Sequence, residues 1–102
     1  MAKLFTPLKI RDIEVRNRIF IAPMCQYSCE DQDGVVNDWH QVHYISRSVG
    51  GAGMIIAEAT AVTPEGRITP WCAGIWGEEH VEAWKKVTTG IAKYGAKSAL
   101  QL

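Results

Sequence analysis

The 102-residue sequence predicts an α/β fold in which a hairpin precedes parallel strands that alternate with helices. Two observations support this class. Short apolar runs suited to buried strands alternate with segments of helical spacing. In addition, the long loops follow strands, whereas the links from helix to strand are tight. Ligands of parallel α/β folds bind at the carboxyl ends of strands, so we expect the chemistry there.

The hairpin and the first strand occupy the start of the chain. Alternation over residues 8–15 predicts a hairpin with its turn at Arg11 and Asp12. A β-rich run then stops at Pro23, which cannot donate to a ladder, so a first strand is predicted over residues 19–22.

A first helix is predicted over residues 38–49. Asn37 is a good N-cap, and Asp38 suits the positive end of the helix dipole. Gly50 and Gly51 can end the helix. The residues that identify the helix share helical spacing: Trp39, Val42, Ile45, Ser46 and Val49.

Two further strands and a second helix complete the pattern. A continuous apolar run predicts a strand over residues 54–58 that is buried on both faces. A strong helical pattern over residues 79–94 ends at Gly95, and a third strand is predicted over residues 97–102. Because the chain stops within an apolar strand, the pattern favours part of a larger domain. The alternative is a small complete domain whose third strand closes the sheet.

Composition and charge narrow the function classes. Eleven basic and eleven acidic residues give a formal net charge of zero, so no basic excess favours a nucleic-acid partner. The longest apolar run is far shorter than the roughly 20 residues that cross a membrane. Three cysteines are few, and an odd number cannot all pair, so a disulfide framework is not expected. The first residues contain no apolar segment of the length found in signal peptides. We therefore expect a cytoplasmic protein without a membrane partner.

The end of the first strand brings reactive side chains together. Cys25 is either a redox-tuning thiol or a small buried hydrophobe. Tyr27 either donates a hydrogen bond or packs. Gln101, in an apolar strand, needs partners for its amide from a ligand or from neighbouring backbone.

Other polar residues have more ordinary interpretations. Glu58 ends the second strand and is either a catalytic carboxylate or, as we expect, the partner of an arginine such as Arg18 or Arg47. His80 is expected at the surface. A loosely finger-like spacing offers an alternative function, a small non-catalytic binding module that holds zinc through Cys25, Cys29, His40 and His43. No glycine fingerprint for a Rossmann dinucleotide site follows a strand.

Several short motifs add a family resemblance that covers essentially the whole chain. They are Leu4-Phe5-Thr6-Pro7, Arg16-Asn17-Arg18-Ile19, Ala22-Pro23-Met24-Cys25-Gln26-Tyr27, Asn37-Asp38-Trp39-His40, Glu58-Ala59-Thr60-Ala61-Val62, Pro64-Glu65-Gly66-Arg67-Ile68-Thr69, Gly74-Ile75-Trp76 and Gln101-Leu102. Their order and spacing resemble the N-terminal part of the Old Yellow Enzyme family of flavin-dependent ene-reductases. The cysteine in Pro-Met-Cys-x-Tyr resembles the bacterial YqjM-like or xenobiotic-reductase-like subclass.

The resemblance implies a fold and an activity. The family fold is a (β/α)₈ TIM barrel that binds FMN at the carboxyl ends of its strands. Residues 1–102 would be the N-terminal segment of that single domain, with the hairpin and about three of the eight strands. NADPH or NADH would reduce FMN. Reduced FMN would then reduce the C=C bond of a small activated alkene, an α,β-unsaturated carbonyl or nitro compound.

The resemblance also implies roles for individual residues. The catalytic residues would be Cys25, which tunes the flavin potential, and Tyr27, which reaches the substrate. The cofactor-binding residues would be Ala22, Pro23, Met24, Cys25, Ala59 and Gln101, the last at the flavin pyrimidine edge. No metal is expected, and the complete protein is expected to be a homo-oligomer. Because the family's carbonyl-polarising donors lie beyond residue 102, this piece alone is expected to be inactive and to hold FMN weakly.

Overall fold

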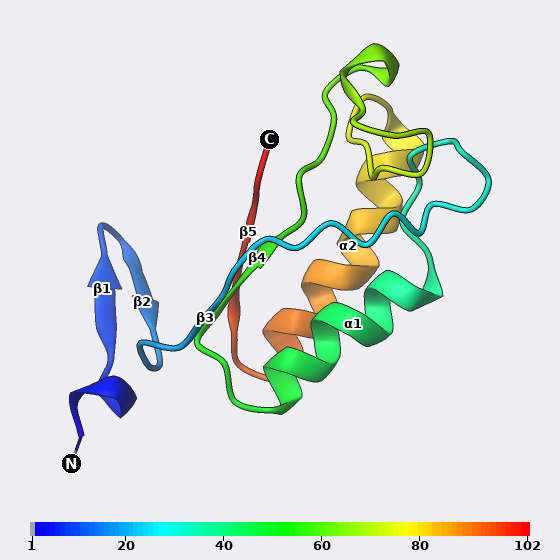
Figure 1. Ribbon diagram of the computed structural model, residues 1–102. Coiled ribbons are helices and arrows are strands. Elements are labelled where there is room, and N and C mark those ends of the chain that lie inside the picture. The colour runs from blue at the N-terminus through cyan, green and yellow to red at the C-terminus, as the bar shows by residue number, and fades with distance from the viewer. Residues whose placement is uncertain (1) are drawn as a thin grey trace.

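The computed structural model describes residues 2–102, and its first element beyond a short 3₁₀ turn (η1, Lys3–Phe5) is a two-stranded hairpin. Strands β1 (Leu8–Ile10) and β2 (Ile13–Val15) pair antiparallel with Leu8 opposite Val15. Arg11 makes the turn with a φ of 51°, in the left-handed region. The predicted hairpin is confirmed, and Figure 1 shows it standing beside the rest of the molecule.

A parallel three-stranded sheet forms the centre of the fold. Its strands are β3 (Phe20–Ile21), β4 (Met54–Ala57) and β5 (Lys97–Leu100), in the order β3-β4-β5. Phe20 lies opposite Met54, which in turn lies opposite Lys97. The strands are shorter than predicted at their carboxyl ends. Within residues 2–102, β3 and β5 each pair with β4 alone, so β5 does not close the sheet.

Two helices cover one face of this sheet (Figure 1). Helix α1 spans Asp38–Val49, as predicted, and α2 spans Glu78–Lys93. Gly51 and Gly95 follow the helices with φ values of 106° and 102°, which glycine adopts without strain. A short 3₁₀ turn, η2 (Pro64–Gly66), lies in the long loop after β4.

The main core lies between the helices and the sheet. Ile55 and Ala57 of β4 pack against the helices, and α2 contributes its predicted apolar face. The core residues are Cys29, Val36, Tyr44, Ala52, Ile55, Ala57, Ala73, Trp84, Val87, Ile91 and Ala96. None of the helices within residues 2–102 combines the length and the apolar character needed to cross a membrane.

Apart from Ile45, which packs against the core, the stripe that identifies α1 is not the face that α1 buries. Val42 is 61% exposed and Val49 is 62% exposed. The buried side chains are instead polar or aromatic: His40, His43, Tyr44 and Ser48. This face is turned inward because tertiary partners satisfy its polar groups. Helical spacing finds a helix but does not say which face will be covered.

His80 is fully buried, so the expectation that it lies at the surface is wrong. Its Nε2 lies 2.9 Å from the Asp33 carbonyl oxygen, and the centroid of its ring lies 4.3 Å from the centroid of the Trp76 ring. A carbonyl 47 residues away makes this burial possible, and no local pattern signals such a partner.

Candidate functional site

The carboxyl ends of β3, β4 and β5 lie at one end of the sheet. Continued beyond the strands, the register brings Met24, Glu58 and Gln101 to corresponding positions. The ladder itself extends past β5, because Gln101 N–H donates to the Ala57 carbonyl at 3.3 Å. Thr60 N–H then donates to the Gln101 carbonyl at 2.8 Å. The structure therefore places the segment after β3 and Gln101 at the same end of the fold.

Cys25 and Tyr27 lie on the segment after β3 at this end. Tyr27 is 47% exposed and Cys25 is half-buried. Interaction with the Cys25 thiol, by hydrogen bonding first and by charge second, raises the pKa of the Tyr27 phenol. A phenol already carries its proton at neutral pH, and the raised pKa extends the pH range in which Tyr27 can donate a hydrogen bond. Its φ of 51° is uncommon for a residue with a bulky side chain, so its neighbours must hold this conformation.

Gln101 and Ala59 border the same end. Gln101 lies beyond β5 with an exposed side chain, so its amide is not buried in an apolar strand as expected. The reason is that β5 pairs with β4 alone within residues 2–102, which leaves the other side of Gln101 open. Ala59 lines a hollow of about 190 Å³ between the segment that follows β4, the loop that contains η2, and Leu102. The lining residues are Ala59, Thr60, Ala61, Gly66, Arg67, Ile68, Cys72 and Leu102.

Glu58 pairs with a phenol rather than with an arginine, so the expected pair with Arg18 or Arg47 is wrong. The buried carboxylate accepts a hydrogen bond from the Tyr44 hydroxyl at 2.6 Å. Arg18 donates to Thr6 Oγ1 and the Pro7 carbonyl, whereas Arg47 donates to the carbonyl of His43. Both arginines are thus engaged locally. Burial, followed by hydrogen bonding to Glu58, raises the pKa of Tyr44.

The residues of the zinc alternative do not form a metal site. Within residues 2–102, no group of three or more His, Cys, Asp or Glu side chains could hold a metal ion. His40 instead completes the capping box of α1, because its Nδ1 accepts from Asn37 N–H at 3.0 Å. Cys29 is buried, and burial raises the pKa of its thiol to about 12, so the thiol stays protonated. The structure gives the zinc-binding module no support.

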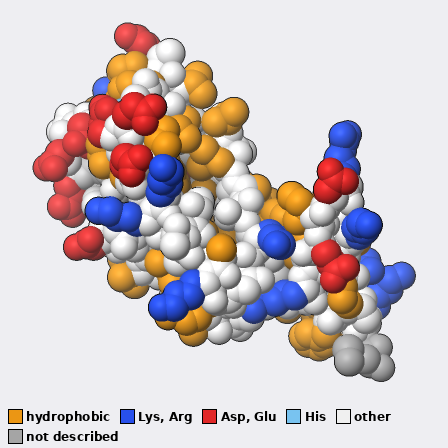
Figure 2. All heavy atoms as spheres, turned by 180° about the vertical axis from the view of Figure 1, so that it is seen from behind, with side chains coloured by type: hydrophobic (Ala, Val, Ile, Leu, Met, Phe, Trp, Pro, Cys, Tyr) orange, Lys and Arg blue, Asp and Glu red, His pale blue; other side chains and the backbone are white. Residues whose placement is uncertain are grey.

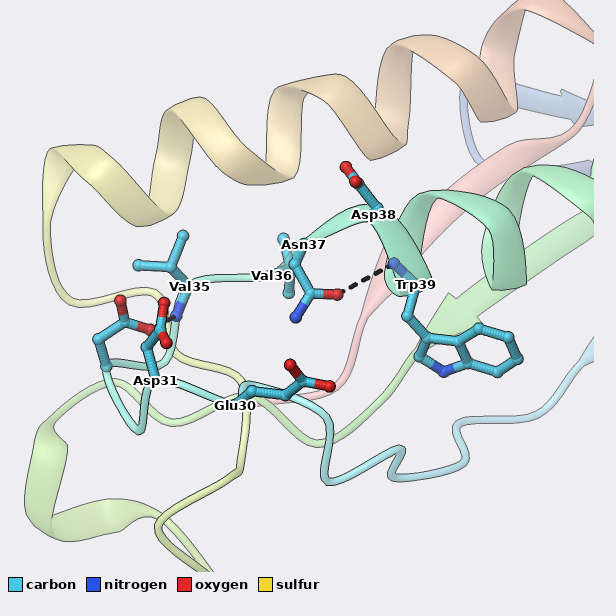
Figure 3. A pocket seen from close by; sticks show the side chains of 8 residues that line it. Glu30, Asp31, Val35, Val36, Asn37, Asp38 and Trp39 are labelled. Carbon is cyan, nitrogen blue, oxygen red and sulfur yellow. Dashed lines mark hydrogen bonds between the residues drawn. The ribbon is translucent and has the colours of Figure 1, made fainter.

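A second hollow of about 430 Å³ lies beside the start of α1. Its lining includes the carboxylates of Glu30, Asp31, Asp33 and Asp38. Figure 3 shows Glu30 and Asp31 on the loop facing the start of α1, where Asn37 Oδ1 accepts from Trp39 N–H at 3.0 Å. Figure 2 shows acidic side chains gathered over the end of the molecule where α2 begins. This negative charge disfavours the phosphate of a nucleotide or flavin, so the strand ends remain the candidate site.

The sequence predicts part of the buried polar cluster behind the site. The helical spacing of His40 favours a packed or capping residue over a zinc ligand, and its capping role is confirmed. Tyr44, in contrast, is not singled out by the sequence reasoning. A signal was present, because His40, Tyr44 and Ser48 recur every four residues and so share one face of α1. Polar side chains at that spacing can mark a helix face with tertiary partners.

Comparisons with known proteins give consistent results. The model of the NADH:flavin oxidoreductase / NADH oxidase family matches residues 3–102. An NADPH dehydrogenase of Bacillus subtilis (strain 168) is 48% identical over 100 residues, which are 98% of this chain and 30% of the relative. An NADPH dehydrogenase of Listeria monocytogenes serotype 4b (strain CLIP80459) is 47% identical over 102 residues, again 30% of the relative. The chain thus spans less than a third of the length of these relatives.

Solved structures share the fold over nearly the whole chain. Morphinone reductase in complex with tetrahydroNAD matches with a TM-score of 0.87 and 32% identity, over 98% of this chain and 26% of that chain. The old yellow enzyme homologue from Zymomonas mobilis matches with a TM-score of 0.88 and 31% identity, over 97% of this chain and 27% of that chain. These similarities confirm the predicted fold class, the N-terminal part of a (β/α)₈ barrel.

Proposed function

Because this chain belongs to the NADH:flavin oxidoreductase / NADH oxidase family, we propose that the complete protein is an FMN-dependent ene-reductase. It would use NADPH or NADH to reduce the C=C bond of small alkenes conjugated to a carbonyl or nitro group. The observation that carries the proposal is the alignment of the three strand ends, which brings the Cys25–Tyr27 segment and Gln101 to one end of the sheet. When bound, FMN supplies the hydride-transfer chemistry.

The residues at this end suit a flat, polar-edged ring. Ala22 and Ala59 carry only methyl side chains, which leave room for a ring against the backbone. The exposed Gln101 amide offers both a donor and an acceptor, which matches the alternating polar atoms of a flavin pyrimidine edge. We propose that Ala22, Pro23, Met24, Cys25, Ala59 and Gln101 form this part of the FMN site.

Cys25 and Tyr27 would have different tasks. The half-buried Cys25 would lie against the cofactor and tune its potential. Tyr27 is exposed, and a phenol carries its proton at neutral pH, so its hydroxyl can donate to a substrate oxygen. The rest of the catalytic machinery would come from later parts of the barrel.

The experiment that tests the proposal uses the complete protein. Purified protein is expected to be yellow, to release FMN on denaturation, and to oxidise NADPH faster when 2-cyclohexenone is added. Mass spectrometry of the product should show the saturated ketone. A protein that binds no flavin and does not reduce the alkene would contradict the proposal.

Residues 1–102 alone are proposed to be inactive. An absorbance spectrum with added FMN, followed by an NADPH oxidation assay with cyclohexenone, tests this part of the proposal. Measurable turnover by the isolated piece would refute it. We also propose that the complete protein is a cytoplasmic homo-oligomer, which light scattering after size-exclusion chromatography and cell fractionation would check.

A further inference from the structure

Glu58 is a buried carboxylate whose partners within residues 2–102 include no lysine or arginine. The Tyr44 hydroxyl donates to Glu58 Oε2 at 2.6 Å, and Glu58 N–H donates to the Tyr44 oxygen at 2.9 Å. These two bonds close a ring between α1 and the end of β4. One phenol therefore fixes both the backbone and the side chain of Glu58.

His40 lies beside the other carboxylate oxygen. Its Nδ1 accepts from Asn37 N–H at 3.0 Å, which assigns the ring N–H to Nε2. His40 Nε2 is buried 3.7 Å from Glu58 Oε1 and has no hydrogen-bond partner within residues 2–102. A buried N–H without a partner is costly, and the carboxylate is the acceptor that lies beside it.

The same carboxylate meets the segment that carries the proposed site. Gln26 N–H lies 3.5 Å from Glu58 Oε1. The Gln26 side chain donates to the Met24 carbonyl at 2.8 Å and accepts from Trp39 Nε1 at 3.0 Å. Gln26 thus contacts Glu58, directly after β4, and Trp39 of α1, and it is bonded covalently to Cys25 and to Tyr27. Tyr27 keeps its uncommon φ only because its surroundings hold it.

We propose that Glu58, Tyr44 and His40 form a positioning unit that fixes Cys25 and Tyr27 through the Gln26 backbone. This inference rests on the proposed function, since it concerns the two residues assigned there to catalysis. None of the three residues of the unit needs to touch cofactor or substrate. A carboxylate suits the task because it is an acceptor only and can take bonds from several donors at once.

Alkylation of Cys25 by iodoacetamide, followed by peptide mass spectrometry of the complete protein without FMN, tests the proposal. Cys29 and Cys72 are buried and serve as internal slow references. Glu58→Ala is expected to raise the Cys25 alkylation rate by about tenfold, because the released segment exposes the thiol more often. Tyr44→Phe removes one hydroxyl and is expected to raise the rate by about threefold. Glu58→Gln keeps an acceptor oxygen, so its Cys25 alkylation rate should lie closer to that of the unmodified protein than the Glu58→Ala rate does.

Ser48→Ala provides the matched control. Ser48 is buried on the same face of α1, but its hydroxyl bonds the Ile91 carbonyl and the Ala96 N–H, away from Gln26. This variant should lower the melting temperature about as much as Tyr44→Phe while leaving the Cys25 rate unchanged. Equal acceleration by Ser48→Ala, or no acceleration by Glu58→Ala and Tyr44→Phe, would overturn the proposal.

A second measurement separates this inference from the proposed function. In the FMN-loaded protein, Tyr44→Phe should shift the visible flavin absorption band, and Ser48→Ala should not. If the complete protein binds no FMN, the proposed function is contradicted. The Cys25 alkylation rates measured without FMN then still decide whether the positioning unit exists. A flavin band that Tyr44→Phe leaves unmoved contradicts the unit even when FMN binds.

Discussion

The two ends of the parallel sheet differ in how their polar groups are used. At the amino end, the Arg16 guanidinium donates to the carbonyls of Ser48, Ala52 and Tyr94, at 2.7, 2.8 and 2.7 Å. These bonds tie both helix-to-strand links to the start of the sheet. At the carboxyl end, buried polar groups surround the loop of Cys25 and Tyr27, and several side chains remain open. The amino end thus serves stability, and the carboxyl end is available for chemistry.

The largest expected effect is on stability at the amino end. A Cβ at Gly53 would lie 2.6 Å from the Asn17 carbonyl oxygen and 2.7 Å from Val15 Cγ1, so Gly53→Ala must shift the backbone. We expect the free energy of unfolding of the complete protein to fall by about 3 kcal/mol in urea denaturation. Gly51→Ala is not a suitable control, because Gly51 has a positive φ that strains any other residue. Gly66→Ala is a suitable control, because the nearest atom to its added Cβ would be the Thr63 hydroxyl oxygen at 3.3 Å.

Arg16→Ala should have the next largest effect. It removes the donor shared by three carbonyls and is expected to cost about 2 kcal/mol, measured in the same way. The Cys25 alkylation rate should not change, because Arg16 contacts only the amino end. A faster reaction at Cys25 would show that the two ends are not independent.

Tyr27→Phe, at the carboxyl end, should affect catalysis and not stability. Tyr27 is 47% exposed, so the loss of its hydroxyl is expected to change the urea midpoint little. If the hydroxyl donates to substrate, the kcat of the complete protein should fall by about tenfold, the scale of one hydrogen bond. An unchanged kcat would contradict a catalytic role for Tyr27 and would leave the description of the fold intact.

The smallest effect is a pH dependence that comes from His43. Burial, and then the charge of Arg47, lowers the pKa of His43 below its ordinary value of 6.5. Below pH 6.5 the unfolded chain therefore binds more protons than the folded chain, so stability falls as the pH decreases towards the folded pKa. His43→Gln should remove this part of the slope between pH 8 and pH 5 in thermal melts. An unaltered slope would show that His43 does not contribute to it.

The fold was largely predictable because its signals are local. Asn37 and Gly51 mark the ends of α1, and the apolar run of β4 marks the central strand, so the element order and the parallel sheet follow. Parallel topology alone then brings the ends of the strands together. The positions of Cys25, Tyr27 and Gln101 at one end of the molecule needed no further information.

The buried polar contacts were not predictable because their partners are distant in the sequence. Glu58 meets Tyr44 instead of an arginine, since a hydroxyl can satisfy a carboxylate without a second buried charge. His80 is buried because the Asp33 carbonyl accepts it. In each case the pattern around the residue gives its chemical type, and only the packed structure gives its partner.

The most direct test of the account is the protection of Cys25 by FMN in the complete protein. If the ends of β3, β4 and β5 hold the flavin, bound FMN covers the half-buried Cys25 and should slow its alkylation at least about tenfold. Arg16→Ala protein should show the same protection. Equal Cys25 alkylation rates with and without bound FMN would place the flavin elsewhere and contradict the account.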